Sequence, residues 1–174
     1  MIKTLLLCTV LLCTGTSIAG GVYEEPEAFI ADVFGNDEPK PEVIWPDKTL
    51  KQTLADILGH AYTSLRIRYW RRDTTTAWVL DEIGKEKPIT TGIVIKDGKV
   101  ERVRILVFRE SRGWEVRHAF FTEQFDQARL QPDLELDRHI DNISGATLSV
   151  NAVSKLVRVA LALDQRVISH PATP

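Results

Sequence analysis

The stretch whose residue types and spacing best suit a chemical role is HIDNISGATLSV, residues 139–150. It places small and hydroxylated residues directly before residues 148–163, whose apolar spacing predicts a helix with Asp164 near its end. The first turn of a helix leaves backbone N–H groups unpaired and carries the positive end of the helix dipole. The spacing therefore predicts a seat for a phosphate group at the start of the last helix.

Two kinds of residue form this predicted seat. Gly145 and Ala146 would let a ligand approach the backbone closely. Ser144, Thr147 and Ser149 supply hydroxyl groups within the same turn. The alternative is an ordinary capped helix, because Ser, Thr and Asp are favoured at helix starts whatever the function. The run from Ser144 to Thr147 is only four residues long, so it is compatible with both interpretations.

A longer pattern runs from Asp141 to Ser149 and continues with Ala152-Val153 in the helix. It resembles the flavinylation motif of the FMN-binding domain family, found in the FMN-carrying subunits of the sodium-translocating NADH:quinone reductase and the Rnf complex. The resemblance implies that Thr147 carries FMN through a phosphoester bond installed by a separate magnesium-dependent flavin transferase. It leaves Asp141 two roles, as an acid that the transferase reads or as a loop or cap residue.

The resemblance also reaches upstream and covers roughly residues 89–163. A strand, an Asp97-Gly98 turn and a second strand match the family, and Glu-Ser-Arg-Gly-Trp at 110–114 occupies the place of its Glu-Thr-Pro-Gly-Leu-Gly loop. The resemblance implies that Glu110, Gly113 and Trp114 belong to the flavin site. Gly113 most simply provides a permissive backbone for the turn. Trp114 either stacks on the isoalloxazine ring or packs in the core.

Hydrophobic periodicity predicts the elements that must position these residues. Three leucines and one isoleucine at helical spacing over residues 50–58, followed by Gly59, predict a first helix. Alternating patterns predict strands at residues 65–70, 76–82, 89–96 and 100–108, with a tight turn at 71–74 and a type I′ turn at Asp97-Gly98. We expect an α+β fold in which helices cover one face of an antiparallel sheet, as in FMN-binding domains.

The chain divides into four predicted parts. Residues 1–19 have the charged start, short apolar run and small final residues of a secretory signal peptide. Residues 20–48 contain several prolines and predict an extended arm with a helical turn. Residues 49–165 form the predicted FMN-binding domain, and residues 166–174 form a C-terminal tail. No later stretch is long and apolar enough to predict a transmembrane segment.

Composition narrows the classes of function. The chain has 174 residues, 44% hydrophobic and 26% charged, as in one ordinary globular domain. The formal net charge is −2, or about −3 once Lys3 is removed, and predicts neither nucleic acid nor an anionic membrane as partner. Cys8 and Cys13 both lie in the predicted signal, so redox chemistry would come from a bound cofactor.

Together these patterns and the resemblance predict an exported, periplasmic flavoprotein. It would carry FMN covalently on Thr147 and transfer electrons between membrane or periplasmic redox proteins. The sequence shows no nucleophile motif or metal cluster that would indicate an enzyme with its own small substrate. Two alternatives stay open: a non-redox accessory or binding module of the same fold, and a reductase that binds FMN noncovalently.

Overall fold

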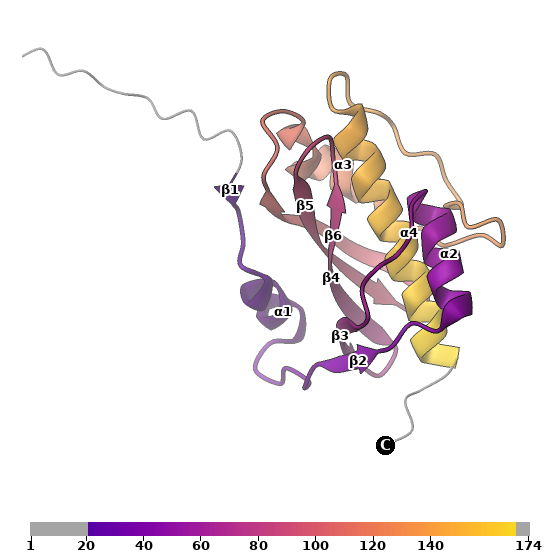
Figure 1. The fold of residues 1–174 in the computed structure, drawn as a ribbon. Coiled ribbons are helices and arrows are strands. Elements are labelled where there is room, and N and C mark those ends of the chain that lie inside the picture. Colours follow the sequence, from indigo (N-terminus) through magenta and orange to yellow (C-terminus); the bar gives the residue numbers. More distant parts are fainter. Residues whose placement is uncertain (1–20, 170–174) are drawn as a thin grey trace, which may run out of the picture.

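The computed structural model describes residues 21–169 and shows an α+β fold built on one antiparallel sheet, which confirms the predicted fold class (Figure 1). The predicted signal peptide lies outside the described residues. Neighbouring strands pair in the order β1-β6-β5-β4-β3-β2. Their bounds are β1 Gly21–Val22, β2 Glu42–Ile44, β3 Ile67–Arg72, β4 Thr75–Ile83, β5 Pro88–Lys96 and β6 Lys99–Phe108.

Tight turns set the register of the four central strands. Asp97 and Gly98 have φ angles of 52° and 70°, which is the backbone of the predicted type I′ turn. This turn pairs Lys96 with Lys99 and aligns β5 along β6. The predicted strands are confirmed, although β3 begins at Ile67 rather than Leu65 and includes Arg71 and Arg72, which were expected in a turn.

Helices α2 (Lys48–Leu58) and α4 (Thr147–Ser169) cover one face of the sheet (Figure 1). The Asp47 side chain caps α2 by accepting a hydrogen bond from the Leu50 N–H at 2.8 Å. The helix ends at Gly59 in the left-handed conformation, as predicted. Short helical segments follow β6: η1 (Trp114–Arg117), α3 (Ala119–Thr122) and η2 (Glu123–Phe125). Within residues 21–169 no helix combines the length and apolar character needed to cross a membrane.

Helix α4 is longer than predicted and continues to Ser169, so the predicted tail begins inside it. The predicted end of the helix was wrong because Asp164 is a core residue, only 2% exposed. Its carboxylate accepts a hydrogen bond from Thr76 Oγ1 at 2.6 Å. Trp78 Nε1 donates to the same threonine oxygen at 2.9 Å. A buried carboxylate with a partner does not end a helix, and the apolar face continues to Val167.

The described part of the predicted arm, residues 21–48, is part of the fold. Strand β1 pairs with β6 and β2 pairs with β3, so this segment supplies both edges of the sheet. Helix α1 (Pro26–Phe34) lies on the face opposite α4 (Figure 1). There it forms a second core, made of Phe29, Ile30, Phe34, Ala77, Val94, Leu106 and Val107. The structure therefore buries both faces of the sheet, where the sequence predicted one.

Candidate functional site

The last helix begins where the sequence predicted a phosphate seat. A turn closes through a hydrogen bond of 2.9 Å from the Ala146 N–H to the Ile143 carbonyl, with Gly145 at φ +82°. The first bond of the helix runs from the Val150 N–H to the Ala146 carbonyl at 2.9 Å. This geometry places Thr147 at the first position of α4. Gly145 and Thr147 are exposed, whereas Ala146 is buried.

The three predicted hydroxyl groups have different surroundings. Ser144 and Thr147 are exposed, whereas Ser149 is 5% exposed. Thr147 Oγ1 accepts a hydrogen bond from Asn142 Nδ2 at 2.8 Å. Asn142 Oδ1 in turn accepts one from the Ile143 N–H at 2.9 Å. Asn142 therefore orients the Thr147 hydroxyl, a role that sequence reasoning missed although Asn142 lies inside the motif.

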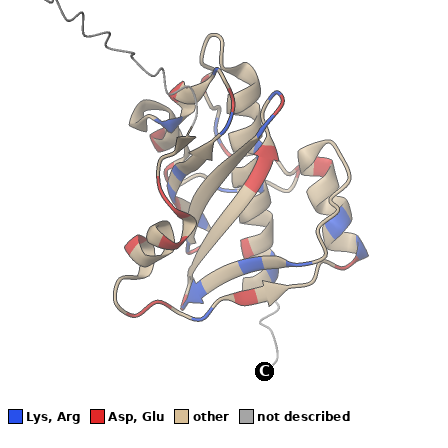
Figure 2. Ribbon diagram, turned by 60° about the vertical axis from the view of Figure 1, so that its left-hand side comes forward, with Lys and Arg blue, Asp and Glu red and all other residues tan. Residues whose placement is uncertain are grey.

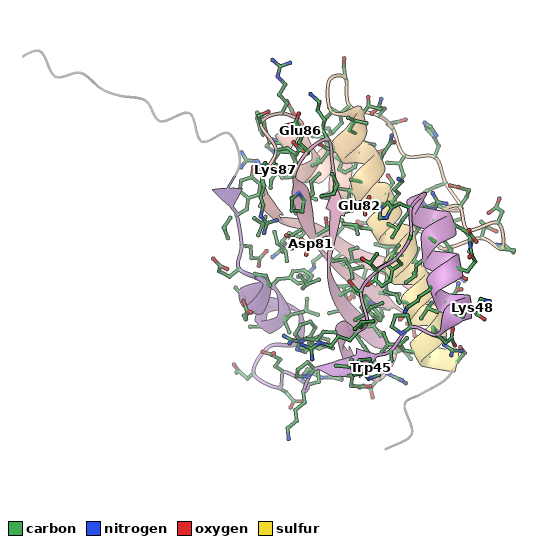
Figure 3. The ribbon with its side chains drawn as sticks, in the orientation of Figure 1. Trp45, Lys48, Asp81, Glu82, Glu86 and Lys87 are labelled. Atoms are coloured by element: carbon green, nitrogen blue, oxygen red, sulfur yellow. The ribbon has the colours of Figure 1, made fainter. Side chains whose placement is uncertain are left out.

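A cavity of about 600 Å³ opens beside the start of α4. Its walls come from the turn after β4, the loop after β6 and the helix start. Figure 3 shows Glu86, in the turn after β4, at the end of the molecule where α4 begins. The lining residues are Lys85, Glu86, Glu110, Ser111, Arg112, Gly145, Ala146, Thr147, Leu148 and Ser149. The structure thus brings Glu110 together with most of the predicted helix-start residues.

Two cations line this cavity and were not predicted as site residues. Lys85 and Arg112 are both exposed, and both line the cavity together with the first residues of α4. Cationic side chains near a helix N-terminus strengthen its affinity for a phosphate group. Sequence reasoning placed Arg112 in the loop at 110–114 but gave it no role. It missed Lys85 because only the pairing of β4 with β5 brings that turn to the site.

Glu110 holds the turn after β4 in place. Its side chain is 5% exposed, and Oε1 accepts backbone N–H bonds from Lys85, Glu86 and Lys87 at 2.5, 2.6 and 2.9 Å. Burial alone would raise the pKa of Glu110, but the three N–H bonds and the Lys85 ammonium lower it below the ordinary 4.5. The ionised carboxylate therefore fixes one wall of the cavity.

Replacing Glu110 with glutamine is expected to destabilise the protein by about 1–2 kcal/mol at neutral pH, because a neutral amide accepts N–H bonds more weakly than a carboxylate. Since folding lowers the pKa of Glu110, the carboxylate's contribution is present above pH 4.5 and is lost as the pH falls through the lowered value. Urea unfolding of both proteins across this pH range measures the effect. A stability difference that persists unchanged in acid would contradict the assignment.

Gly113 joins the loop after β6 to the start of α4. Its φ is +86°, which confirms the prediction of a permissive backbone at this turn. A Cβ at this position would overlap Ser149 Oγ and lie 3.2 Å from Ser149 Cβ and 3.5 Å from Ala146 Cβ. Gly113 therefore has a second role, because only a residue without a side chain lets the loop pack against the helix start.

Trp114 and Asp141 lie outside the cavity lining. Trp114 is 39% exposed. Its ring is edge-on to the His118 ring at a centroid distance of 5.3 Å, and the Arg117 guanidinium lies 5.0 Å from the centroid of the Trp114 ring. Asp141 donates its backbone N–H to Gln124 Oε1 at 2.7 Å, and its exposed carboxylate lies 3.7 Å from His139 Nε2. The Asp141 carboxylate is thus open to contact from another protein.

Leu148, the second residue of α4, extends the hollow surface along the helix. Its side chain is 51% exposed and lines both the first cavity and a second one of about 400 Å³. The second cavity is lined by apolar, neutral polar and charged side chains, among them Ile83, Leu136, Glu135 and Lys155. Across residues 21–169 the acids and histidines form no cluster that could hold a metal ion.

Comparison with known proteins gives one match. Residues 84–162 match the family model of the FMN-binding domain. This segment begins at the turn that Glu110 holds and extends past Thr147 into α4, so it contains the walls of the first cavity. No curated protein and no solved structure matches the chain. The match confirms the resemblance seen in the sequence.

Proposed function

Residues 84–162 belong to the FMN-binding domain family, and we propose that this flavin-binding protein carries its FMN through a phosphoester bond to Thr147. One observation carries the proposal. The Thr147 hydroxyl is exposed at the first position of α4, lines the 600 Å³ cavity and is oriented by Asn142. No other exposed hydroxyl of the motif combines these three properties, since Ser144 does not line the cavity and Ser149 is buried.

The surrounding groups suit the phosphate end of FMN. The unpaired N–H groups of the first turn of α4 would donate to phosphate oxygens, and Gly145 would let the phosphate approach the backbone. Lys85, after β4, and Arg112, after β6, line the same cavity and would help to balance its charge. The apolar Leu148 would support the body of the flavin. When bound, FMN supplies one-electron and two-electron redox chemistry, while the protein supplies position and electrostatics.

A covalent bond to FMN is consistent with the proposed location of the protein in the periplasm. We propose that residues 1–19 direct export to the periplasm and that residues 49–165 form the flavin domain. An exported protein has no ready supply of FMN, so a tether prevents loss of the cofactor. A magnesium-dependent flavin transferase would make the bond, with the exposed Asp141 as part of the segment it reads. The loaded protein would then pass electrons between membrane or periplasmic redox partners.

Replacing Asn142 with alanine is expected to slow flavin attachment about tenfold without abolishing it, because Thr147 keeps its hydroxyl but loses the hydrogen bond that orients it. The time course of flavin loading, followed by intact mass with a purified transferase, measures this rate. Ser144→Ala is the matched control, since Ser144 is exposed in the same loop. Equal rates for both variants would remove Asn142 from the site.

The proposal is tested on the mature protein co-expressed with a flavin transferase. Intact mass and in-gel flavin fluorescence after denaturation should show a gain of one FMN less water and a flavin that stays with the chain. Flavin that dissociates on denaturation would instead support the noncovalent reductase. An unmodified and colourless chain, with a transferase that modifies a known target, would support the non-redox binding module.

A further inference from the structure

The end of the molecule opposite the candidate site carries an exposed surface, here called the β2–β3 face. It consists of Val43, Trp45, Leu65, Arg66 and Arg68. Trp45 is 68% exposed, Leu65 is 70% exposed and Val43 is 39% exposed. Figure 3 shows Trp45 at one end of the molecule and Glu86, beside the candidate site, at the other.

The strand register explains how apolar and cationic side chains share this face. Val43 lies directly opposite Arg68 in the β2–β3 ladder. Trp45 directly follows β2, and Leu65 and Arg66 directly precede β3, so these three exposed residues continue the chain beyond the paired Val43 and Arg68. Ile44 and its partner Ile67 point the other way, toward the main core. The β2–β3 face is therefore an exposed surface of apolar and cationic side chains, distinct from the core residues on the other side of the strands.

The two arginines of the β2–β3 face have no ion-pair partner within the part of the chain that the structure describes. Arg66 and Arg68 are exposed and form no ion pair among residues 21–169. Glu27 and Asp81 line the same hollow as Arg66 and Arg68, but neither acid forms an ion pair with these arginines. Two further acids nearby have other partners. Glu42 accepts a hydrogen bond from the Tyr69 hydroxyl at 2.6 Å, and Asp47 pairs with Arg166 at 2.7 Å. Figure 2 shows Lys and Arg along β3 at this edge of the molecule.

We propose that the β2–β3 face docks on the surface of an anionic lipid bilayer. Trp45 follows the end of β2 and Leu65 lies in a bend before β3, and both side chains are largely exposed. Tryptophan favours the interfacial layer of a bilayer, and arginine is attracted to anionic headgroups. A protein hot spot would instead place such a tryptophan in a packed pocket. The net charge of the chain predicted no such partner because a sum does not report local clustering.

This docking would turn the candidate flavin site away from the lipid. The cavity beside Thr147 lies at the far end from Trp45, so a bound flavin would face the exposed domain of a redox partner (Figure 3). This orientation rests on the proposed function. Lipid binding by the β2–β3 face does not, and a chain without flavin should bind equally well.

Sedimentation with vesicles tests the docking surface on the mature chain. We expect the chain to sediment with vesicles of phosphatidylcholine and phosphatidylglycerol in equal parts, and not with phosphatidylcholine alone. Binding should weaken with salt. Partitioning should fall about fivefold for each arginine removed in Arg66→Ser/Arg68→Ser. Trp45→Ser should lower it on the same vesicles.

Matched variants separate this surface from general effects of charge and apolar exposure. Lys87→Ser/Lys99→Ser removes two charges elsewhere, and Phe120→Ser removes an exposed aromatic side chain that is 60% exposed. Both controls should sediment as the parent does, and circular dichroism should show every variant folded. Equal binding to both kinds of vesicle, equal loss in the controls, or no binding to any vesicle would overturn the proposal. The last result would point to an acidic protein as the partner of this face.

Discussion

Replacing Thr147 with alanine is expected to leave the denatured protein without any flavin, although the fold stays intact. The side chain is exposed at the first helical position, where alanine is compatible with the helix. Its only hydrogen bond among the described residues comes from Asn142, which is itself exposed and can bond to water instead. Loss of the oxygen that forms the ester would therefore remove the modification at little cost in stability.

Two matched variants make the Thr147 result specific. Thr147→Ser keeps a hydroxyl at the same position and should still acquire the mass of one FMN less water. Ser144→Ala removes a different exposed hydroxyl from the same turn and should load as the parent does. Intact mass after co-expression with an active transferase reads all three. Flavin retained on the denatured Thr147→Ala protein would place the attachment at another residue.

Replacing Gly113 with alanine is expected to destabilise the protein by about 3 kcal/mol, because two separate costs add. A side chain in the left-handed region at φ +86° costs about 1–2 kcal/mol. The new Cβ would also overlap Ser149 Oγ, and forcing a methyl group into packed structure costs about 1–3 kcal/mol. Ser149 is buried at the start of α4, so the shift that relieves the overlap would also disturb the phosphate seat.

Other glycine and serine variants separate these two costs. Gly98 has φ +70° and no atom within 4 Å of the position that a Cβ would take, so Gly98→Ala measures the backbone cost alone. Ser149→Ala removes the overlapping oxygen, and in the double variant it should restore part of the stability lost by Gly113→Ala. Chemical unfolding gives the free energies. A Gly113→Ala protein no less stable than Gly98→Ala would show that the contact with Ser149 does not matter.

Local patterns in the sequence were sufficient to predict the motif and most of the helices and strands. The run from Asp141 to Ser149 predicted the start of α4, because capping chemistry and apolar spacing act over a few residues. The turn at Asp97-Gly98 predicted the β5–β6 hairpin, because few residues tolerate positive φ at both positions. The family match over residues 84–162 agrees with both.

Other parts of the fold depended on contacts that a local pattern does not contain. The prolines of residues 20–48 suggested an arm, yet Phe29 and Phe34 complete a second core that exists only once the sheet has formed. Asp164 suggested a helix end, yet its partner Thr76 lies on β4, far away in the sequence. Burial of a polar side chain by a distant strand cannot be read from its neighbours in the chain.

By itself the sequence indicated a helix start whose N–H groups and dipole suit a phosphate, and its resemblance to the FMN-binding domain family pointed to the Thr147 hydroxyl as the proposed attachment point. Only the tertiary structure decided what faces that oxygen. The pairing of β4, β5 and β6 brings Lys85, Glu110 and Arg112 to the helix start. The physical reason is range, because helix capping acts over one turn, whereas a cavity is formed by the side chains and backbone of segments that meet only when the sheet assembles.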